Sequence, residues 1–248
     1  MKRKKIITII AIIAMCLFVT GCNKKEETIK KEKENIKKEK VETLITEDMN
    51  QKIDRFIDAF QLKYTSITNE ELEENEKLYY AFYFASNKWT VDYVEREAVE
   101  KTMLELFGSN IKYDDKDIKS LFTDETMVYY RDGRYVYNHN TAHGVTAVKG
   151  YSYETSRTRN NSIIKVELKR IYNNCRGDTC PVSEIFKDPE YKEKIEVPEK
   201  YCYYDQSMPD FCIVQMEDYV KENLDSLPTL TFEFNLENNN PVFNRVYR

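Results

Sequence analysis

Glycine, proline, histidine and tryptophan are scarce in this chain of 248 residues, which has six glycines, six prolines, two histidines and one tryptophan. Loops that cradle phosphate groups depend on glycine, and the sequence contains neither a P-loop nor a dinucleotide-binding loop. It also lacks the G-x-S-x-G sequence of the hydrolase nucleophile elbow. The composition therefore argues against nucleotide-dependent enzymes and against hydrolases of that kind.

Long hydrophobic runs are missing as well. The longest apolar stretch extends from Ile6 to Val19, is interrupted only by Thr8, and follows four cationic residues at positions 2–5. A helix over this stretch would rise about 21 Å, which is less than the roughly 30 Å of a bilayer's hydrocarbon core. A charged segment followed by a short apolar segment is typical of a signal peptide that is removed.

The apolar stretch ends in Val19-Thr20-Gly21-Cys22. This series of an aliphatic residue, two small residues and a cysteine resembles the lipobox of bacterial membrane lipoproteins. The resemblance implies that residues 1–21 are a lipoprotein signal peptide, and that Cys22 becomes the new N-terminus and carries acyl chains such as palmitate. Two acyl chains hold a protein stably at a membrane. We therefore expect a lipid-anchored protein on the extracytoplasmic face of the cell membrane.

Residues 22–46, which follow the signal, hold eight lysines and six glutamates but few apolar side chains. Such a segment cannot bury a core, so we interpret it as a charged tether after the lipidated cysteine. Without the four basic residues of the signal, the formal net charge falls from −5 to −9, and without the tether it falls to −11 for residues 47–248. We expect these residues to form a single acidic domain that repels nucleic acid and has no nucleic-acid partner.

The first half of this domain has helical periodicity. Thr46 is placed to cap a first helix, a second helix is expected from near Thr68 to about Ser86 with an acidic first turn, and a third is expected to end at Gly108. Spacings of i, i+3, i+4 and i+7 predict a buried stripe in the first helix at Ile53, Phe56, Ile57 and Phe60. The third helix carries Val99, Met103, Leu106 and Phe107 on one face.

From Met127 the pattern alternates, as in strands. Asp132-Gly133 between aromatic segments predicts a hairpin, and residues 145–155 continue the alternating pattern. Residues 161–172 alternate apolar and charged side chains, which is typical of a sheet with one solvated face. Residues 228–248 alternate again, turn at consecutive asparagines and return.

Helices followed by antiparallel strands predict an α+β fold, with N-terminal helices packed on a curved antiparallel sheet and a cysteine-containing insertion. The order of elements resembles that of cystatin-like folds. This resemblance rests on element order and implies no functional residue.

The insertion spans residues 173–212 and contains Cys175, Cys180, Cys202 and Cys212. Outside the cytoplasm such cysteines are disulfide candidates, and four of them allow three pairings. The short, turn-rich loops favour pairing of neighbours in sequence over the two crossed alternatives. A tetrathiolate zinc site is less favoured because it would need closer C-x-x-C spacing.

Between the first two of these cysteines lies Arg176-Gly177-Asp178, a sequence that also serves as an adhesion ligand. Short motifs arise by chance, and glycine and aspartate are what a tight turn needs in any case. We therefore interpret the loop as structural and treat host adhesion through these three residues as the less favoured alternative.

Aromatic side chains cluster at Tyr79, Tyr80, Tyr83 and Trp89. Such side chains can form a binding rim because one end is apolar and the other polar, although the same spacing also suits a helix that borders a core. The histidines, His139 and His143, do not fill a metal shell, and the acidic residues 114–117 lack the ligand pattern of a calcium loop. We expect no metal and no cofactor.

These features together favour a binding or interaction module of the cell envelope. Its partners would be the membrane, through the lipid anchor, and a protein, peptide or glycan ligand in the envelope. An envelope enzyme with a carboxylate-based site is the alternative, because a pair of catalytic carboxylates has no sequence signature among so many acidic residues.

Overall fold

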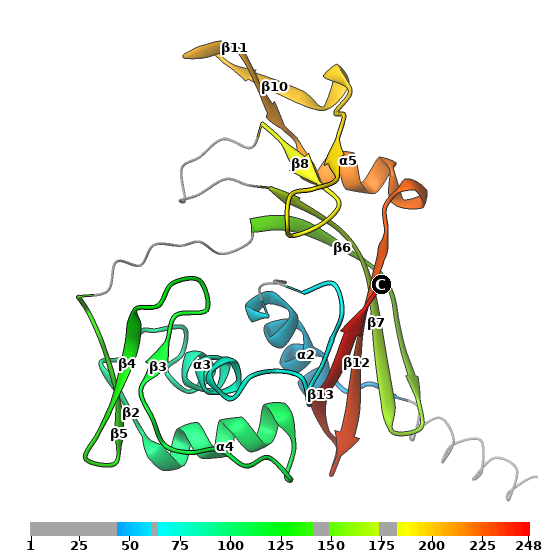
Figure 1. The fold of residues 1–248 in the computed structure, drawn as a ribbon. Helices are drawn as coiled ribbons and strands as arrows, with labels where there is room; N and C mark the ends of the chain where they lie inside the picture. Colours follow the sequence, from blue (N-terminus) through cyan, green and yellow to red (C-terminus); the bar gives the residue numbers. More distant parts are fainter. Residues whose placement is uncertain (1–43, 61–63, 141–148, 174–182) are drawn as a thin grey trace, which may run out of the picture. The chain divides into compact units, whose positions relative to one another are not determined.

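The computed structural model describes residues 44–60, 64–140, 149–173 and 183–248, which hold four α-helices and three antiparallel sheets (Figure 1). Three of the helices lie in the first half of the chain, and most of the strands follow them. The fold is α+β, as predicted from the order of helical and alternating patterns.

Helix α2 (Glu47–Ala59) begins where its cap predicts. The Thr46 Oγ1 atom accepts a hydrogen bond from the backbone N–H of Met49 at 3.3 Å, which satisfies one of the free donors of the first turn. The predicted apolar stripe is buried, and Ile53, Phe56 and Phe60 are each 2% exposed or less.

Helix α3 (Glu74–Ala85) begins later than predicted. Strand β1 (Ile67–Thr68) occupies the expected start and pairs with strand β13 (Asn240–Tyr247). The Glu71 carboxylate accepts a hydrogen bond from the backbone N–H of Thr68 at 2.8 Å and so forms a turn. Glu73 and Glu76 then form the capping box of the helix. The acidic run therefore forms a turn and a cap, because its side chains compete for the backbone donors that a helix would leave free.

Helix α4 (Arg96–Phe107) buries Val99, Met103 and Phe107 and ends at Gly108, as predicted, whereas Leu106 is only partly buried. Gly108 has a φ of 98°, a conformation that side chains with a Cβ atom rarely adopt.

The largest sheet has the strand order β1-β13-β12-β7-β8-β9, and the long strand β6 pairs with the other edge of β7. In β7, Ile164, Val166 and Leu168 are buried and point to the same face, as the alternation predicts. The β6–β7 hairpin is long and curved, with a register shift between Glu154 and Ser156. The bounds of the strands not yet given are β6 (Lys149–Asn160), β7 (Ile163–Asn173), β8 (Ile185–Phe186), β9 (Lys194–Ile195) and β12 (Thr229–Glu237).

A second, four-stranded sheet has the order β2-β5-β4-β3, from β2 (Tyr93–Glu95), β3 (Ile118–Lys119), β4 (Thr126–Arg131) and β5 (Arg134–Tyr137). Its central hairpin turns at Asp132 and Gly133, whose φ values are 49° and 78°, as the Asp-Gly pair predicts. The alternating pattern of residues 145–155 forms a strand where the structure describes it, since residues 149–155 belong to β6. Strand β6 joins the large sheet, because β7 offers it a partner along its whole length.

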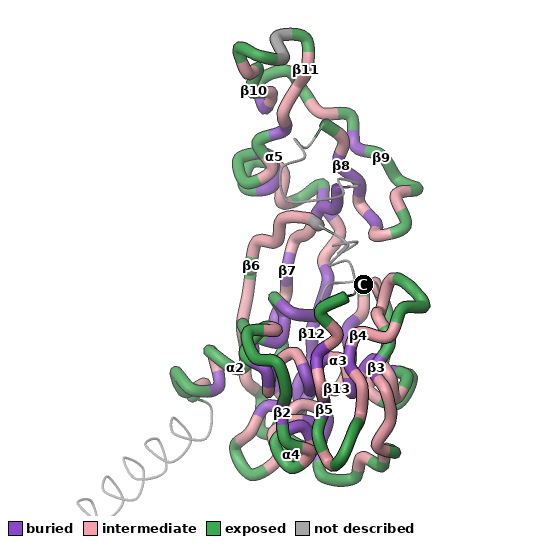
Figure 2. The backbone as a smooth tube through the Cα atoms, turned by 90° about the vertical axis from the view of Figure 1, so that its left-hand side faces the viewer, coloured by how far each residue is buried: buried purple, intermediate pink, exposed green. Residues whose placement is uncertain are grey.

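The main hydrophobic core lies between the helices and the strands beside them, where buried positions concentrate (Figure 2). The Phe56 ring is central, with its centroid 5.1 Å from that of Phe60, 5.0 Å from Phe243 and 5.6 Å from Phe234. Residues 45–248 form one compact unit.

A second, smaller core forms around the insertion. It packs β8 and β9 against helix α5 (Met216–Glu222), the 3-10 turn η1 (Glu199–Tyr201) and the 3-10 turn η2 (Leu224–Ser226). The insertion therefore adds two strands to the large sheet. It also forms a separate hairpin of β10 (Cys202–Asp205) and β11 (Met208–Val214), which the disulfide between Cys202 and Cys212 closes.

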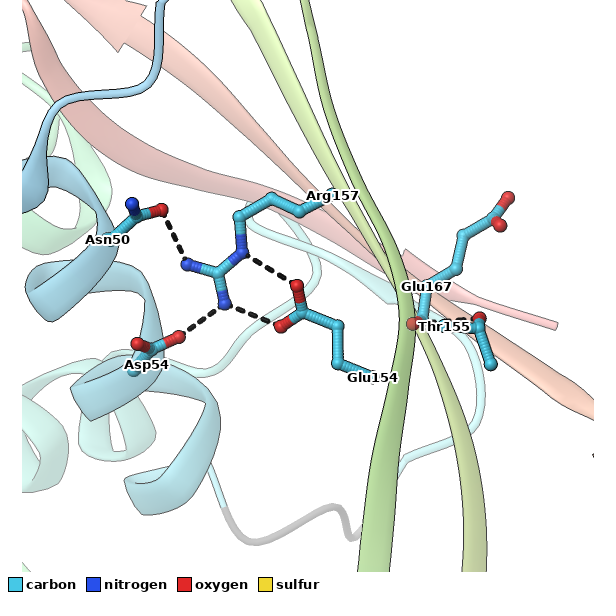
Figure 3. A network of polar contacts seen from close by, with 6 residues as sticks. All are labelled: Asn50, Asp54, Glu154, Thr155, Arg157 and Glu167. Atoms are coloured by element: carbon cyan, nitrogen blue, oxygen red, sulfur yellow. Dashed lines mark hydrogen bonds and ion pairs between the residues drawn. The ribbon is translucent and has the colours of Figure 1, made fainter. Parts of the chain in front are cut away.

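An arginine joins the β6–β7 hairpin to helix α2 (Figure 3). The Arg157 guanidinium on β6 donates to the Asn50 side chain at 2.8 Å, forms an ion pair with Asp54, and binds both carboxylate oxygens of Glu154. At the register shift beside it, Thr155 donates to the carbonyl of Glu167 at 3.2 Å. These bonds join α2 to the sheet and involve all three nitrogens of the guanidinium.

Candidate binding groove

A groove of about 740 Å³ lies along the solvent side of the C-terminal hairpin formed by β12 and β13. Its volume is in the range of small-molecule and peptide sites. The floor is formed by β12 and β13, and the walls by the turn after β1, by helix α3 and by the segment after α4. The lining residues are Thr68, Asn69, Glu70, Lys77, Phe107, Gly108, Asn110, Ile111, Lys112, Glu233, Asn235, Glu237, Val242, Phe243, Asn244 and Arg245.

Glu233 on the floor is only 4% exposed, although the alternation of β12 places it opposite the main core. Its carboxylate lies 3.2 Å from the Arg245 guanidinium and 3.3 Å from the Lys165 ammonium, and it accepts a hydrogen bond from the Asn244 side chain at 2.8 Å. Burial alone would raise the pKa of this carboxyl, but these partners together lower it. Glu233 is therefore an ionised, fully partnered part of the floor.

Asn69 in the wall carries a hydrogen-bond acceptor that has no partner among the described residues. Its side-chain N–H group donates to the Phe107 carbonyl at 2.8 Å and its backbone N–H donates to the Asn244 carbonyl at 2.7 Å, which fix the residue from two sides. The Oδ1 atom is buried and accepts no hydrogen bond from the described residues. An unsatisfied buried acceptor costs about 1–3 kcal/mol, and because this atom is shielded from solvent it is not open to a ligand in the groove.

Lys77 of helix α3 supplies a cation to the groove. The side chain is half-buried, and within the described parts of the chain its ammonium group forms no ion pair and no hydrogen bond. Burial lowers the pKa of Lys77, although the charges of Glu70 and Glu76 act in the opposite direction. A partly desolvated ammonium without a direct partner favours the approach of an anionic group.

The opposite wall depends on Gly108. A Cβ atom at this position would lie 2.9 Å from the Oε1 atom of Glu237 and 3.4 Å from a methyl carbon of Val242. The absence of a side chain lets the segment after α4 approach the hairpin, where the backbone N–H of Ser109 donates to Glu237 at 3.1 Å. This contact closes one side of the groove.

A second, smaller pocket of about 150 Å³ lies between α2, α4 and the tip of the same hairpin. It is lined mainly by apolar side chains, including Phe56, Phe84 and Leu106. The Arg55 guanidinium at its edge donates to the Phe84 carbonyl at 3.0 Å and stacks over the Phe84 ring at 4.7 Å. Because this cation already has partners, the pocket offers fewer free groups than the groove.

Part of the predicted site lies outside the described residues. This applies to the lipid-attachment residue Cys22, to Cys175 and Cys180, to the adhesion sequence Arg176-Gly177-Asp178, and to His143. Cys202 and Cys212 form the disulfide expected from neighbour pairing. The helices of the described part of the chain include none long and apolar enough to cross a membrane.

The predicted aromatic rim divides into two environments. Tyr80 is 4% exposed and stacks on Phe60 at 5.2 Å, so it belongs to the main core. Tyr79, Tyr83 and Trp89 are half-buried and contact one another, with Trp89 5.1 Å from Tyr79 and 5.9 Å from Tyr83. None of the four lines the groove.

The other polar residues singled out from the sequence have partners in the structure. The ring nitrogen of His139 lies 3.0 Å from the Asp92 carboxylate. In the acidic segment 114–117, Asp115 pairs with Arg96, Lys116 with Glu74, and Asp117 with Arg131. Within the described ranges no group of three or more metal-ligating side chains comes together.

Two S-x-x-K spacings, Ser109 to Lys112 and Ser162 to Lys165, also occur in the chain. Acyl-transfer enzymes use this spacing on a helix, where both side chains share one face. Here both serines lie in turns, and Lys165 is bound to Glu233. The groove therefore has no serine activated by a neighbouring lysine of this kind in the described structure.

Comparison of the chain with models of protein families, with curated proteins and with solved structures found no match. The function is therefore inferred from the side chains themselves. The groove residues Asn69, Lys77 and Asn235 are common surface types that lie far apart in the sequence, so no spacing rule could have found them. Only the fold brings them together.

Proposed function

We propose that this protein is a lipid-anchored binding module of the cell envelope, attached through Cys22 and exposed on the extracytoplasmic face of the membrane. The lipobox-like sequence at residues 19–22 supports the anchor, and the charged tether that follows would carry the domain away from the lipid surface. The groove above β12 and β13 is the proposed ligand site.

One observation carries the binding role: the groove is lined by the half-buried Lys77 ammonium, which forms no ion pair and no hydrogen bond within the described residues. Wherever a pKa shift is resolved for a described aspartate or glutamate, the shift is downward. A carboxylate-based glycosidase needs an acid with a raised pKa. The groove is thus better suited to holding a ligand than to protonating one.

Fatty-acid labelling tests the anchor. Cells that produce the full chain are supplied with labelled palmitate, and the protein is compared with Cys22→Ser and with the matched control Cys16→Ser. We expect label on the wild type and on Cys16→Ser, and none on Cys22→Ser. Label that persists on Cys22→Ser would exclude lipidation at that residue.

Thermal unfolding tests the groove. A ligand that binds only the folded state raises the melting temperature. Asn235 is exposed on the floor, so Asn235→Trp fills the groove, whereas Thr158→Trp places the same side chain on an exposed strand position outside it. We expect envelope extract to stabilise the full-length wild type and Thr158→Trp, but not Asn235→Trp. Equal stabilisation of all three would show that the ligand binds elsewhere.

A further inference from the structure

The smaller pocket, between α2, α4 and the tip of the hairpin formed by β12 and β13, is separate from the groove. Its volume is about 150 Å³, and none of its lining residues lines the groove. An engineered apolar cavity of about 150 Å³ holds one benzene ring, whereas sites for drug-sized molecules begin at about 300 Å³. The pocket is therefore large enough for a single ring and too small for a long acyl chain.

Phenylalanine rings form the most buried part of this pocket. Phe56 and Phe234 are each 2% exposed and meet edge to face, with their centroids 5.6 Å apart, and Phe84 is 9% exposed. Aromatic rings attract further rings in edge-to-face and offset geometries. The phenylalanine floor thus favours an aromatic group over an aliphatic group of the same size.

Leu106 on α4 leaves apolar surface exposed to this pocket. Its position on one face of the helix with Met103 and Phe107 predicts burial, yet Leu106 is only partly buried while both neighbours are buried. Because Leu106 lines the pocket, a ligand there would cover the surface that the fold leaves open. Removing apolar surface from water favours binding.

Arg55 places a cation at the edge of the pocket. Its Nη2 atom donates to the Phe84 carbonyl at 3.0 Å, and the guanidinium lies over the Phe84 ring at 4.7 Å. The side chain is exposed, and among the described residues its other N–H groups form no hydrogen bond and no ion pair. The planar guanidinium is suited to binding a carboxylate through two parallel hydrogen bonds.

The other charged groups of the lining already have ion-pair partners. The Lys52 ammonium lies 3.1 Å from the Asp48 carboxylate, and the Lys101 ammonium lies 3.8 Å from the Glu105 carboxylate. Arg55 is therefore the charged lining residue that lacks an ion pair within the described structure. A ligand with a single negative charge complements it.

We infer that this pocket binds a small aromatic monocarboxylate, whose ring lies against the phenylalanine floor and Leu106 and whose carboxylate pairs with Arg55. The inference goes beyond the proposed role of the groove and does not depend on it, because the two sites share no lining residue.

Fluorine NMR with the full chain in lipid nanodiscs tests this inference, with empty nanodiscs as the correction for partition into lipid. The probe is 4-fluorophenylacetate. Its amide lacks the charge, and trifluoroacetate keeps the charge but lacks the ring. We expect the acid to bind about 5-fold more tightly than the amide, which is the upper range for an ion pair with an exposed side chain, and trifluoroacetate to show no saturable binding.

Arg55→Met keeps the apolar stem and removes the charge, so the acid and the amide should then bind equally. Arg134→Met is the matched control, because Arg134 also lies over an aromatic ring, that of Tyr93 at 4.9 Å, but outside the pocket. Leu106→Trp fills the pocket and should abolish binding, whereas Leu104→Trp, at an exposed position on the same helix, should preserve it. Circular dichroism confirms that the four variants are folded.

Absence of saturable binding, equal affinity of the acid and the amide for the wild type, an unchanged preference in Arg55→Met, or undiminished binding to Leu106→Trp would overturn the inference. Hexanoate is the competitor that tests the need for a ring. If it displaces the probe as well as unlabelled phenylacetate does, the pocket accepts any short apolar acid and the aromatic assignment is wrong.

Discussion

The two hydrophobic cores of this protein are stabilised in different ways. The main core contains 31 buried residues of the described chain, including the stacked rings around Phe56, whereas the core around the insertion contains eight. The smaller region also carries the disulfide between Cys202 and Cys212. The difference follows from the surface each region can bury, since a small core rarely offsets the conformational entropy of its chain without a cross-link.

The regions of the main core and of the smaller core also differ in the function we propose for them. Only a large core can tolerate polar groups that lack partners nearby, because each costs stability. The groove lies on the hairpin that closes the main core, and in the described structure the Asn69 oxygen in its wall has no hydrogen-bond partner. We therefore propose that the ligand binds to the large region and that the cross-linked region supports it.

The largest effect is expected from the centre of the main core. Phe56→Ala removes a ring that contacts three other aromatic rings within 6 Å, and it should lower the free energy of unfolding by about 3–5 kcal/mol. Urea denaturation measures the loss. Leu104→Ala, at a position 39% exposed, is the matched control and should cost less than about 1 kcal/mol.

Removing the disulfide tests the stability of the smaller, cross-linked region. The double variant Cys202→Ser/Cys212→Ser opens a short loop, with a sequence separation of 10, and should destabilise by about 2–3 kcal/mol. The loss should be local. Limited proteolysis is expected to cut within residues 183–214 first and to leave the main core intact, and early cleavage in α2 would show that the two regions unfold together.

The Arg157 network should contribute less than either core. Arg157→Met removes the bonds to Asp54, Glu154 and Asn50 from a side chain only 14% exposed, and a loss of about 1–2 kcal/mol is expected. Lys101→Met breaks an exposed pair with Glu105 and should change stability by less than about 0.5 kcal/mol. Chemical denaturation at low and high salt compares the two, and equal losses would contradict a structural role for Arg157.

The smallest effect concerns the pH dependence of Glu233. Its pKa is lowered in the folded state, so its contribution is fully present above the ordinary value of 4.5 and is lost as the pH falls through the folded value. Glu233→Gln should cost about 1 kcal/mol at pH 7, since Lys165 and Arg245 are half-exposed, and the cost should shrink below pH 4.5. If the destabilisation by Glu233→Gln instead increased as the pH fell, this prediction would be wrong. Thermal unfolding from pH 3 to 7 checks this.

Local patterns predicted the features that neighbouring residues determine. The Thr46 cap, the end of α4 at Gly108 and the turn at Asp132-Gly133 each depend on a few adjacent positions. The start of α3 and the division into two large sheets were not predictable in this way, because they depend on strand pairing between distant segments. Propensity does not encode such pairing.

The groove could not be predicted from the sequence for a related reason. The alternation of β12 predicts a solvated face for Glu233, yet the walls above it leave that side chain 4% exposed. Asn69 and Lys77 have no distinctive neighbours in the sequence. Only the folded structure shows that both line the groove and that their Oδ1 and ammonium groups have no direct partner among the described residues.

Photo-crosslinking in intact cells tests the assignment of ligand binding most directly. A photo-reactive phenylalanine analogue is introduced at Asn235 in the groove, at Tyr203 on the cross-linked hairpin, where the side chain is 52% exposed, and at Thr158 as the control. Mass spectrometry then identifies the adducts. We expect a discrete adduct from Asn235 and none from the other two positions. An adduct from Tyr203 without one from Asn235 would place the ligand on the small region and contradict the assignment.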